Sequence, residues 1–201
     1  GTPCQIAALK LFLLKDHYNL LIVDVVCHGV PSPKIWRQYL TSLKLDDIGN
    51  IYHKDKVTGW RGYSFSIRDV KGNVIYTQKA SSNKYLSAFV KNLTLRPSCF
   101  SCPSKAGKSL SDITLADYWG IEYLLPRMDD NKGISLICVN SKKGKEAISK
   151  LNIEIWQTDY DKTIPHNICI AKSTNEPKER FSFWEAYDKD GITALPSIQK
   201  P

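Results

Sequence analysis

The sequence lacks any apolar run long enough to cross a membrane. A membrane-spanning helix needs roughly 20 apolar residues, whereas the longest apolar stretch here runs from Leu20 to Val26 and is interrupted by Asp24. No basic segment followed by an apolar one and a small-residue cleavage site opens the chain. We therefore expect no membrane span.

The sequence also has no internal repeat, no low-complexity segment and no high density of cysteine residues. Six cysteines in 201 residues are too few for a disulfide-stapled scaffold, and their spacing favours a reducing, cytoplasmic setting. Hydrophobic residues make up 42% and charged residues 24% of the chain. This composition is that of a globular protein and excludes a disordered chain, a collagen and a coiled coil.

Positive charge is in excess. The chain carries 28 Lys and Arg against 20 Asp and Glu, a net charge of +8, which favours anionic partners such as nucleic acid, acidic lipid or phosphorylated cofactors. The basic residues are scattered along the chain instead of forming a stripe. We therefore expect no nucleic acid, and the charge alone does not choose among the other anionic partners.

Helical and strand patterns follow one another with short links, which is typical of an α/β fold. The patterns predict a mixed sheet with flanking helices and an inserted β-hairpin that turns at Lys71-Gly72-Asn73. They predict one domain over residues 1–190 and an unstructured tail over 191–201. Helices are expected at 5–15, 32–43, 83–93, 143–151 and 177–187, and strands at 20–26, 48–53, 63–68, 74–78, 111–116, 134–139 and 153–157.

The cysteines divide by position. Cys99 and Cys102 form a C-x-x-C in the loop 96–111, and Cys4 and Cys27 stand at the ends of predicted elements. Four such thiolates suit a tetrahedral Zn²⁺ or an iron–sulfur cluster, and spacing alone leaves cluster, zinc and neither open. The other two, Cys138 and Cys169, lie in apolar runs and are interpreted as core cysteines.

The loop around the C-x-x-C is basic. Ala106 to Ser109 is similar to the end of a phosphate-binding loop, but Cys102 stands where that motif needs its first glycine, which excludes a P-loop hydrolase. Lys105 and Lys108 then fit either charge balance for an anionic cluster or cofactor, or a solvated basic loop.

Two further segments have site-like chemistry. The Gly1 to Gln5 helix start offers backbone N–H groups to an anion. The Asp112 to Gly120 segment ends a strand with Tyr-Trp-Gly, where Trp119 could stack on a flat ring or simply pack below a turn. Asp129 to Gly133 could line the same crevice or form an acidic surface turn.

Five blocks, taken together and in order, resemble the C-terminal domain of the coenzyme F420 hydrogenase/dehydrogenase beta-subunit family. The resemblance covers residues 1 to about 150. The blocks are Gly1 to Gln5, Asp24 to Ser32, Gly59-Trp60, Leu95 to Cys102, and Ser111 to Gly120.

The resemblance implies an oxidoreductase subunit: an iron–sulfur flavoprotein module that passes electrons between a deazaflavin or flavin-type hydride carrier and a cluster. The implied cofactors are a [4Fe–4S] cluster, FAD, and coenzyme F420 or another hydride carrier. The implied partner is a redox protein or an upstream ferredoxin-like segment, whose absence agrees with the abrupt start of the chain. The resemblance implies Cys4, Cys27, Cys99 and Cys102 as cluster ligands, and Gly1, Thr2, Pro3, Gln5, His28, Lys105, Lys108, Asp112, Thr114, Asp117, Trp119 and Gly120 as cofactor-binding residues.

Two other functions stay open. One is a zinc-stabilised basic module that docks on nucleic acid or a partner protein. The other is a degenerate family member kept as a non-catalytic assembly domain. No convincing acid–base pair stands out in the sequence, so no catalytic residue is predicted.

Overall fold

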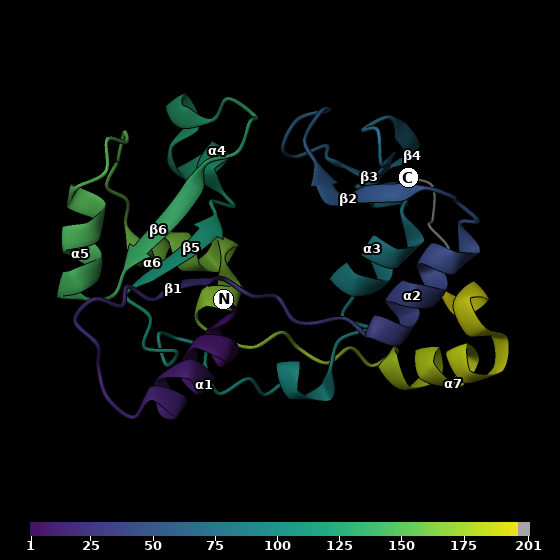
Figure 1. Ribbon diagram of the computed structural model, residues 1–201, viewed down its shortest axis with the longest axis horizontal. Coiled ribbons are helices and arrows are strands. Elements are labelled where there is room, and N and C mark those ends of the chain that lie inside the picture. Colours follow the sequence, from purple (N-terminus) through teal and green to yellow (C-terminus); the bar gives the residue numbers. More distant parts are fainter. Residues whose placement is uncertain (197–201) are drawn as a thin grey trace. The chain divides into compact units, whose positions relative to one another are not determined.

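The computed structural model describes residues 1–196 and divides them into two compact units (Figure 1). Unit 1 comprises residues 1–28 and 101–174, and unit 2 comprises residues 29–100 and 175–196. Each unit is thus built from two separate stretches of the chain. The prediction of a single domain over residues 1–190 stays a prediction.

Unit 1 is built on a three-stranded mixed sheet in the order β1-β5-β6. Strand β1 (Val23–Val25) runs parallel to β5 (Ile113–Asp117), and β6 (Ser135–Val139) pairs antiparallel with β5. Its helices are α1 (Pro3–Leu13), α4 (Ile121–Leu124), α5 (Lys142–Ser149) and α6 (Tyr160–Thr163), with 3-10 turns η3 (Pro126–Met128), η4 (Ile164–His166) and η5 (Ile168–Ile170).

The first helix of unit 1, α1, begins at Pro3 and ends at Leu13, two residues earlier at each end than the predicted helix over 5–15. Pro3 occupies the first helical position, where its missing N–H costs nothing. The Gln5 side-chain oxygen accepts a hydrogen bond from the Thr2 backbone N–H at 2.9 Å. This contact satisfies a donor at the helix start, so the Gly1 to Gln5 turn is a helix cap in this structure.

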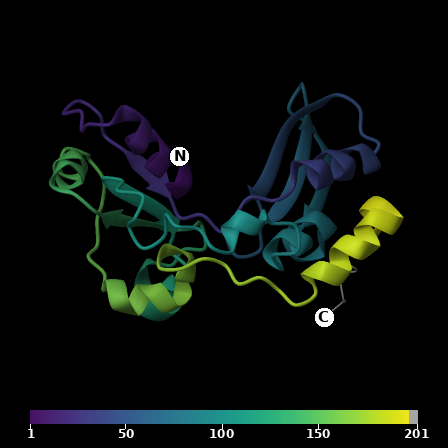
Figure 2. The ribbon, with the colours of Figure 1, turned by 90° about the horizontal axis from the view of Figure 1, so that it is seen from below.

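Unit 2 is built on an antiparallel sheet in the order β2-β3-β4. The strands are β2 (Ile48–Asp55), β3 (Ser64–Asp69) and β4 (Val74–Lys79). Figure 2 shows this sheet with its helices from a second direction. Those helices are α2 (Pro33–Ser42), α3 (Lys84–Val90) and α7 (Arg180–Asp190), with 3-10 turns η1 (Ala80–Ser82), η2 (Pro97–Cys99) and η6 (Gly191–Ala194).

The core of unit 2 is aromatic. Phe65 and Ile67, two positions apart on β3, are 0% exposed, and they pack with Tyr39 of α2 and Tyr85 of α3. The two tyrosine rings stack at 5.3 Å. Apolar burial of this kind is the main stabilising term of a small unit.

Two three-stranded sheets with flanking helices confirm the predicted α/β fold class. The predicted β-hairpin is formed by β3 and β4. The strand predicted at Ile153–Gln157 is wrong: the segment is irregular, and Ile153 and Ile155 are about half exposed at 48% and 55%. An alternating pattern forms a strand only where a neighbouring strand pairs with it, and no such pairing occurs in the described residues.

The predicted unstructured tail is wrong at its start. Residues Gly191–Ala194 form η6, and Leu195 is 3% exposed because it packs into the core of unit 2. Residues 197–201 lie outside the described residues. Within residues 1–196, no helix combines the length and apolar character that crossing a membrane would require.

Candidate functional site

Unit 1 contains a cavity of about 430 Å³ on one face of its sheet. Asp24, Thr114 and Cys138 are paired across β1, β5 and β6, so their side chains point to the same face, and all three line the cavity. The loop from Ser104 to Ser109, α6 and Cys169 supply the walls. The volume lies in the range of small-molecule sites.

Asp24 forms the buried acidic end of this row. The residue is 1% exposed, and its Oδ2 accepts a hydrogen bond from the Ser109 hydroxyl at 2.6 Å. Its Oδ1 is buried and has no hydrogen-bond partner in the part of the chain that the structure describes. A buried carboxylate oxygen without a donor is costly, so the lining of the cavity includes a carboxylate that has one unsatisfied oxygen.

Thr114 and Asn140 place neutral polar groups beside this carboxylate. The Asn140 amide nitrogen donates to the Thr114 hydroxyl at 2.9 Å and to the Ser111 hydroxyl at 3.2 Å. Because the Thr114 oxygen accepts from Asn140, its own hydrogen is available to donate, either to Ser111 Oγ at 3.2 Å or into the cavity. The cavity floor therefore offers an acceptor and a donor side by side.

Lys105 ties three segments together at the cavity wall. Its side-chain Nζ donates to the backbone carbonyls of Cys169, at 2.9 Å, and of Cys27. The residue is only 9% exposed. The buried ammonium thus fixes the end of the β1 segment against η5 and contributes a positive charge to the wall.

Cys169 and His28 form a second polar pair at this wall. The Cys169 Sγ lies 3.8 Å from His28 Nδ1. The hydrogen bond from His28 lowers the pKa of the Cys169 thiol, assisted by the charge of Lys105, and outweighs the opposing effect of burial. By contrast, burial and the charge of Asp24 raise the pKa of Cys138. Cys138 is half-buried and packs against the core of Tyr118, Ile121 and Leu136, as its interpretation as a core cysteine predicts. That interpretation is wrong for Cys169, which is half-buried beside His28 at the cavity wall.

The four cysteines implied as cluster ligands form no disulfide and divide between the two units. Cys4 is exposed in unit 1, Cys27 and Cys102 are half-buried there, and Cys99 belongs to unit 2, where its Sγ accepts from the Val30 N–H at 3.4 Å. Within residues 1–196, no three or more His, Cys, Asp or Glu side chains form a group that could hold a metal ion. The ligand role of these cysteines stays a prediction.

The structure places the implied cofactor-binding residues in several separate parts of unit 1. Pro3, Lys105 and Thr114 line the cavity, and His28 contacts its wall through Cys169. Gly1, Thr2 and Gln5 surround the start of α1, where Gln5 caps the helix and the Gly1 carbonyl accepts from the Val25 N–H. Lys108 is exposed and lies on a separate shallow groove beside α1.

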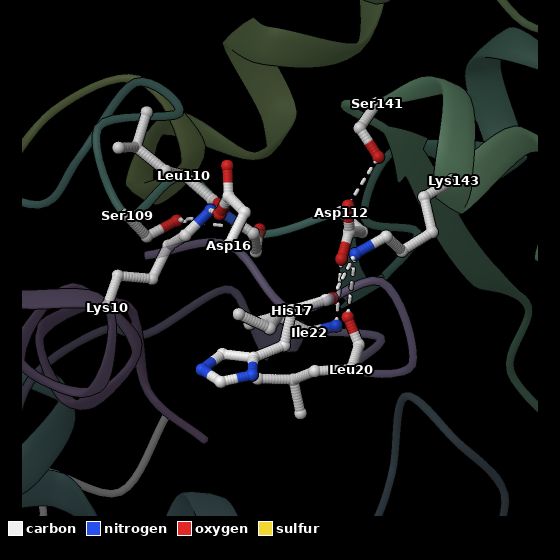
Figure 3. Close-up of polar contacts among 11 residues, drawn as sticks. Lys10, Asp16, His17, Leu20, Ile22, Ser109, Leu110, Asp112, Ser141 and Lys143 are labelled. Atoms are coloured by element: carbon white, nitrogen blue, oxygen red, sulfur yellow. Dashed lines mark hydrogen bonds and ion pairs between the residues drawn. The ribbon is translucent and has the colours of Figure 1, made fainter. Parts of the chain in front are cut away.

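Asp112 joins separate segments of unit 1 (Figure 3). Its Oδ2 accepts from the Ile22 N–H at 2.9 Å, and its Oδ1 accepts from the Ser141 hydroxyl, which caps α5. Nearby, Lys143 Nζ donates to the carbonyls of His17 and Leu20 at 2.9 and 3.0 Å. Burial raises the pKa of Asp112, but the two hydrogen bonds and the charges of Lys143 and Lys10 bring it below its ordinary value. These contacts make Asp112 a structural link.

The Asp117, Trp119 and Gly120 turn lies at the far end of β5, outside the cavity lining. Gly120 has φ +85°, and a Cβ there would lie 2.3 Å from the His166 ring. Trp119 is 41% exposed, and its carbonyl accepts from the Asn167 amide at 3.0 Å. The turn therefore anchors the η4 segment.

Sequence reasoning missed several cavity residues, chiefly Asp24, Asn140, Tyr160 and Cys169. One signal was present, because Asp24 is a lone acid inside an apolar strand, and such an acid needs a partner or a function. Cys169 carried no comparable signal, since its partner His28 lies 141 positions earlier in the chain.

Residues 1–161 match the family described as the C terminus of the beta subunit of coenzyme F420 hydrogenase/dehydrogenase. No curated protein and no solved structure matches the chain. The matched range contains all of β1, β5 and β6, and with them the floor of the cavity.

Proposed function

Because the chain belongs to the coenzyme F420 hydrogenase/dehydrogenase beta-subunit family, a family of oxidoreductase subunits, we propose that it is an electron-transfer module. In this proposal the cavity of unit 1 binds a hydride-carrying deazaflavin or flavin-type cofactor, and the protein works with an iron–sulfur cluster and a redox partner. The cofactor supplies the hydride chemistry when it is bound, while the protein binds and orients it.

The cavity on the sheet face is the observation that supports cofactor binding. It combines a floor of Asp24 and Thr114 with apolar surface from Val26, Leu136 and Ile170. Cofactor sites in proteins are typically concave and mostly apolar, with a few polar groups that fix orientation. The net charge of +8 suits a ligand that carries phosphate.

Iron–sulfur binding by Cys4, Cys27, Cys99 and Cys102 is proposed on family grounds and on the position of these thiols at loops and element ends. The described side chains form no metal-holding group, so no electron route through a cluster is derived from the geometry. The alternative, a zinc-stabilised binding module, would use the same thiols.

The cofactor part of the proposal is tested by titrating the anaerobically purified chain with FAD, FMN and a 5-deazaflavin and following ligand fluorescence. A Cys138→Phe variant fills the cavity floor and should abolish binding. Its matched control is Val25→Phe on the opposite face of the sheet, where Val25 is 45% exposed, and this variant should bind normally. A wild-type chain that binds none of the three ligands contradicts the proposal.

The cluster part is tested by anaerobic reconstitution with iron and sulfide. Thiolate-bound iron–sulfur clusters absorb broadly near ~400 nm, and Cys102→Ser should remove this absorption whereas Cys138→Ser should keep it. Stoichiometric zinc instead of iron would favour the binding module. A stable chain that takes up neither metal nor flavin would indicate a degenerate assembly domain.

A further inference from the structure

The unsatisfied oxygen of Asp24 restricts which ligand can occupy the cavity of unit 1. Asp24 is 1% exposed, Ser109 satisfies only its Oδ2, and Oδ1 has no partner among the described residues. An oxygen of this kind is stabilised by a ligand that brings an N–H donor. A ligand phosphate cannot take this place, because two negative charges would face each other in a buried site.

The Thr114 side chain, next to Asp24, restricts the class of ligand further. Thr114 is the direct strand partner of Asp24. Its oxygen accepts from Asn140 at 2.9 Å, so its hydrogen is left either for Ser111 Oγ at 3.2 Å or for a ligand in the cavity. The floor therefore presents an acceptor next to a donor. The complementary ligand edge has an N–H next to a carbonyl oxygen, which is the edge of a cyclic imide.

We infer that Asp24 is the residue that recognises the ring N–H of a cyclic imide, with Thr114 donating to the adjacent carbonyl. This inference rests on the proposed function, since flavins and deazaflavins share such an imide in their pyrimidine-dione ring. It assigns the direction of the ligand: the ring edge meets the sheet at Asp24, and the phosphate-bearing chain points away from it.

The test compares FMN with N3-methyl-FMN, which lacks the imide N–H, on the wild-type chain by fluorescence titration. A hydrogen bond to a charged group contributes about 1.5–3 kcal/mol, so methylation should weaken binding about tenfold to hundredfold. The same pair of 5-deazaflavin ligands, with and without the N-methyl group, shows which of the two ring systems the cavity prefers.

N3-methyl-FMN could bind weakly for two reasons: it lacks the N–H donor, or its methyl group does not fit into the cavity. Variants of the protein separate these two causes. Asp24→Ala removes the acceptor and makes space, so FMN and N3-methyl-FMN should bind this variant within about twofold of each other. Asp161→Asn, an exposed carboxylate on α6 beside the cavity, is the charge-matched control and should keep the wild-type preference. Circular dichroism checks that each variant is folded.

The outcomes distinguish this inference from the proposed function. Equal affinity of the wild-type chain for FMN and N3-methyl-FMN overturns the role of Asp24 and leaves cofactor binding intact. An Asp24→Ala variant that is folded and still prefers FMN as strongly as wild type also overturns it. A wild-type chain that binds neither flavin nor deazaflavin overturns both.

Discussion

The two units use sheets of equal strand number in different ways. In unit 2 the central strand β3 places Phe65 and Ile67 at 0% exposure in an aromatic core. In unit 1 the central strand β5 places Thr114 between Asp24 and Cys138, on a face that lines a cavity. Unit 2 therefore uses its sheet face for stability, whereas unit 1 leaves part of its sheet face open to a cavity, which is the proposed ligand site.

This difference has an energetic consequence. Burying a large apolar side chain stabilises a fold by about 1.5–3 kcal/mol, whereas a buried carboxylate oxygen without a donor costs stability. A ligand that supplies the missing donor and binds only the folded state stabilises unit 1 by mass action. Substitutions in unit 2 should therefore change stability, and substitutions at the floor of unit 1 should change binding.

The largest effect is expected for Phe65→Ala. Phe65 is 0% exposed and touches Trp36, Tyr39 and Tyr76 through edge-on ring contacts, so its truncation leaves a cavity and should lower the free energy of unfolding by about 3–5 kcal/mol. Urea denaturation followed by circular dichroism measures this loss. FMN affinity of the folded variant should stay within about twofold of wild type, and a loss below about 1 kcal/mol would contradict the role given to this core.

A smaller effect is expected for Gly120→Ala in unit 1. The residue has φ +85°, and the added Cβ would meet the His166 ring at 2.3 Å, so backbone strain and steric overlap should together cost about 2–4 kcal/mol. Gly72→Ala in the hairpin of unit 2 is the matched control, since Gly72 has φ +90° and nothing within 4 Å of the added Cβ. That variant should lose only the backbone part, about 1 kcal/mol, and equal losses would exclude the steric contribution of His166.

Asp112→Asn should lower stability by about 1–2 kcal/mol at neutral pH, because the carboxylate accepts from the Ile22 N–H and the Ser141 hydroxyl. The pKa of Asp112 lies below its ordinary value in the folded state. Its contribution is therefore present above the unfolded-state pKa, about 3.9, and is lost as the pH falls through the folded-state value. Urea denaturation of the wild-type and Asp112→Asn proteins between pH 7 and pH 2 measures the free energy of unfolding of each. The difference between the two free energies should shrink at the acid end. A difference that stays constant with pH would contradict the stabilising role given to the Asp112 carboxylate.

The sequence predicted local elements well because local chemistry determines them. Ser32 before Pro33 and Asn83 before Lys84 stand at the starts of α2 and α3, as their patterns predict. The strand at Ile153–Gln157 failed because strand formation depends on a pairing partner that local alternation does not specify. The site was predicted least well, since Asp24, Thr114 and Cys138 become neighbours only through the pairing of three strands distant in sequence.

The smallest effect concerns two thiols of the same cavity. Hydrogen bonding from His28 lowers the pKa of Cys169, whereas burial and the charge of Asp24 raise the pKa of Cys138. The thiolate is the reactive form, so alkylation of Cys169 should reach its half-maximal rate at a lower pH than alkylation of Cys138. Iodoacetamide labelling between pH 6 and pH 10, resolved by peptide mass spectrometry, gives both profiles.

Replacing His28 tests the cause of this difference. His28→Ala removes the hydrogen bond to Cys169 Sγ, so the pKa of the thiol should rise and its alkylation near pH 7 should slow about threefold to tenfold, the change expected for about 1 kcal/mol of lost stabilisation. The Cys138 profile should not move, because Asp24 and burial set it. Parallel slowing of both thiols would indicate a general change in access to the cavity. An unchanged Cys169 profile would show that Lys105 and Thr174, which also lower the pKa of this thiol, are sufficient without His28.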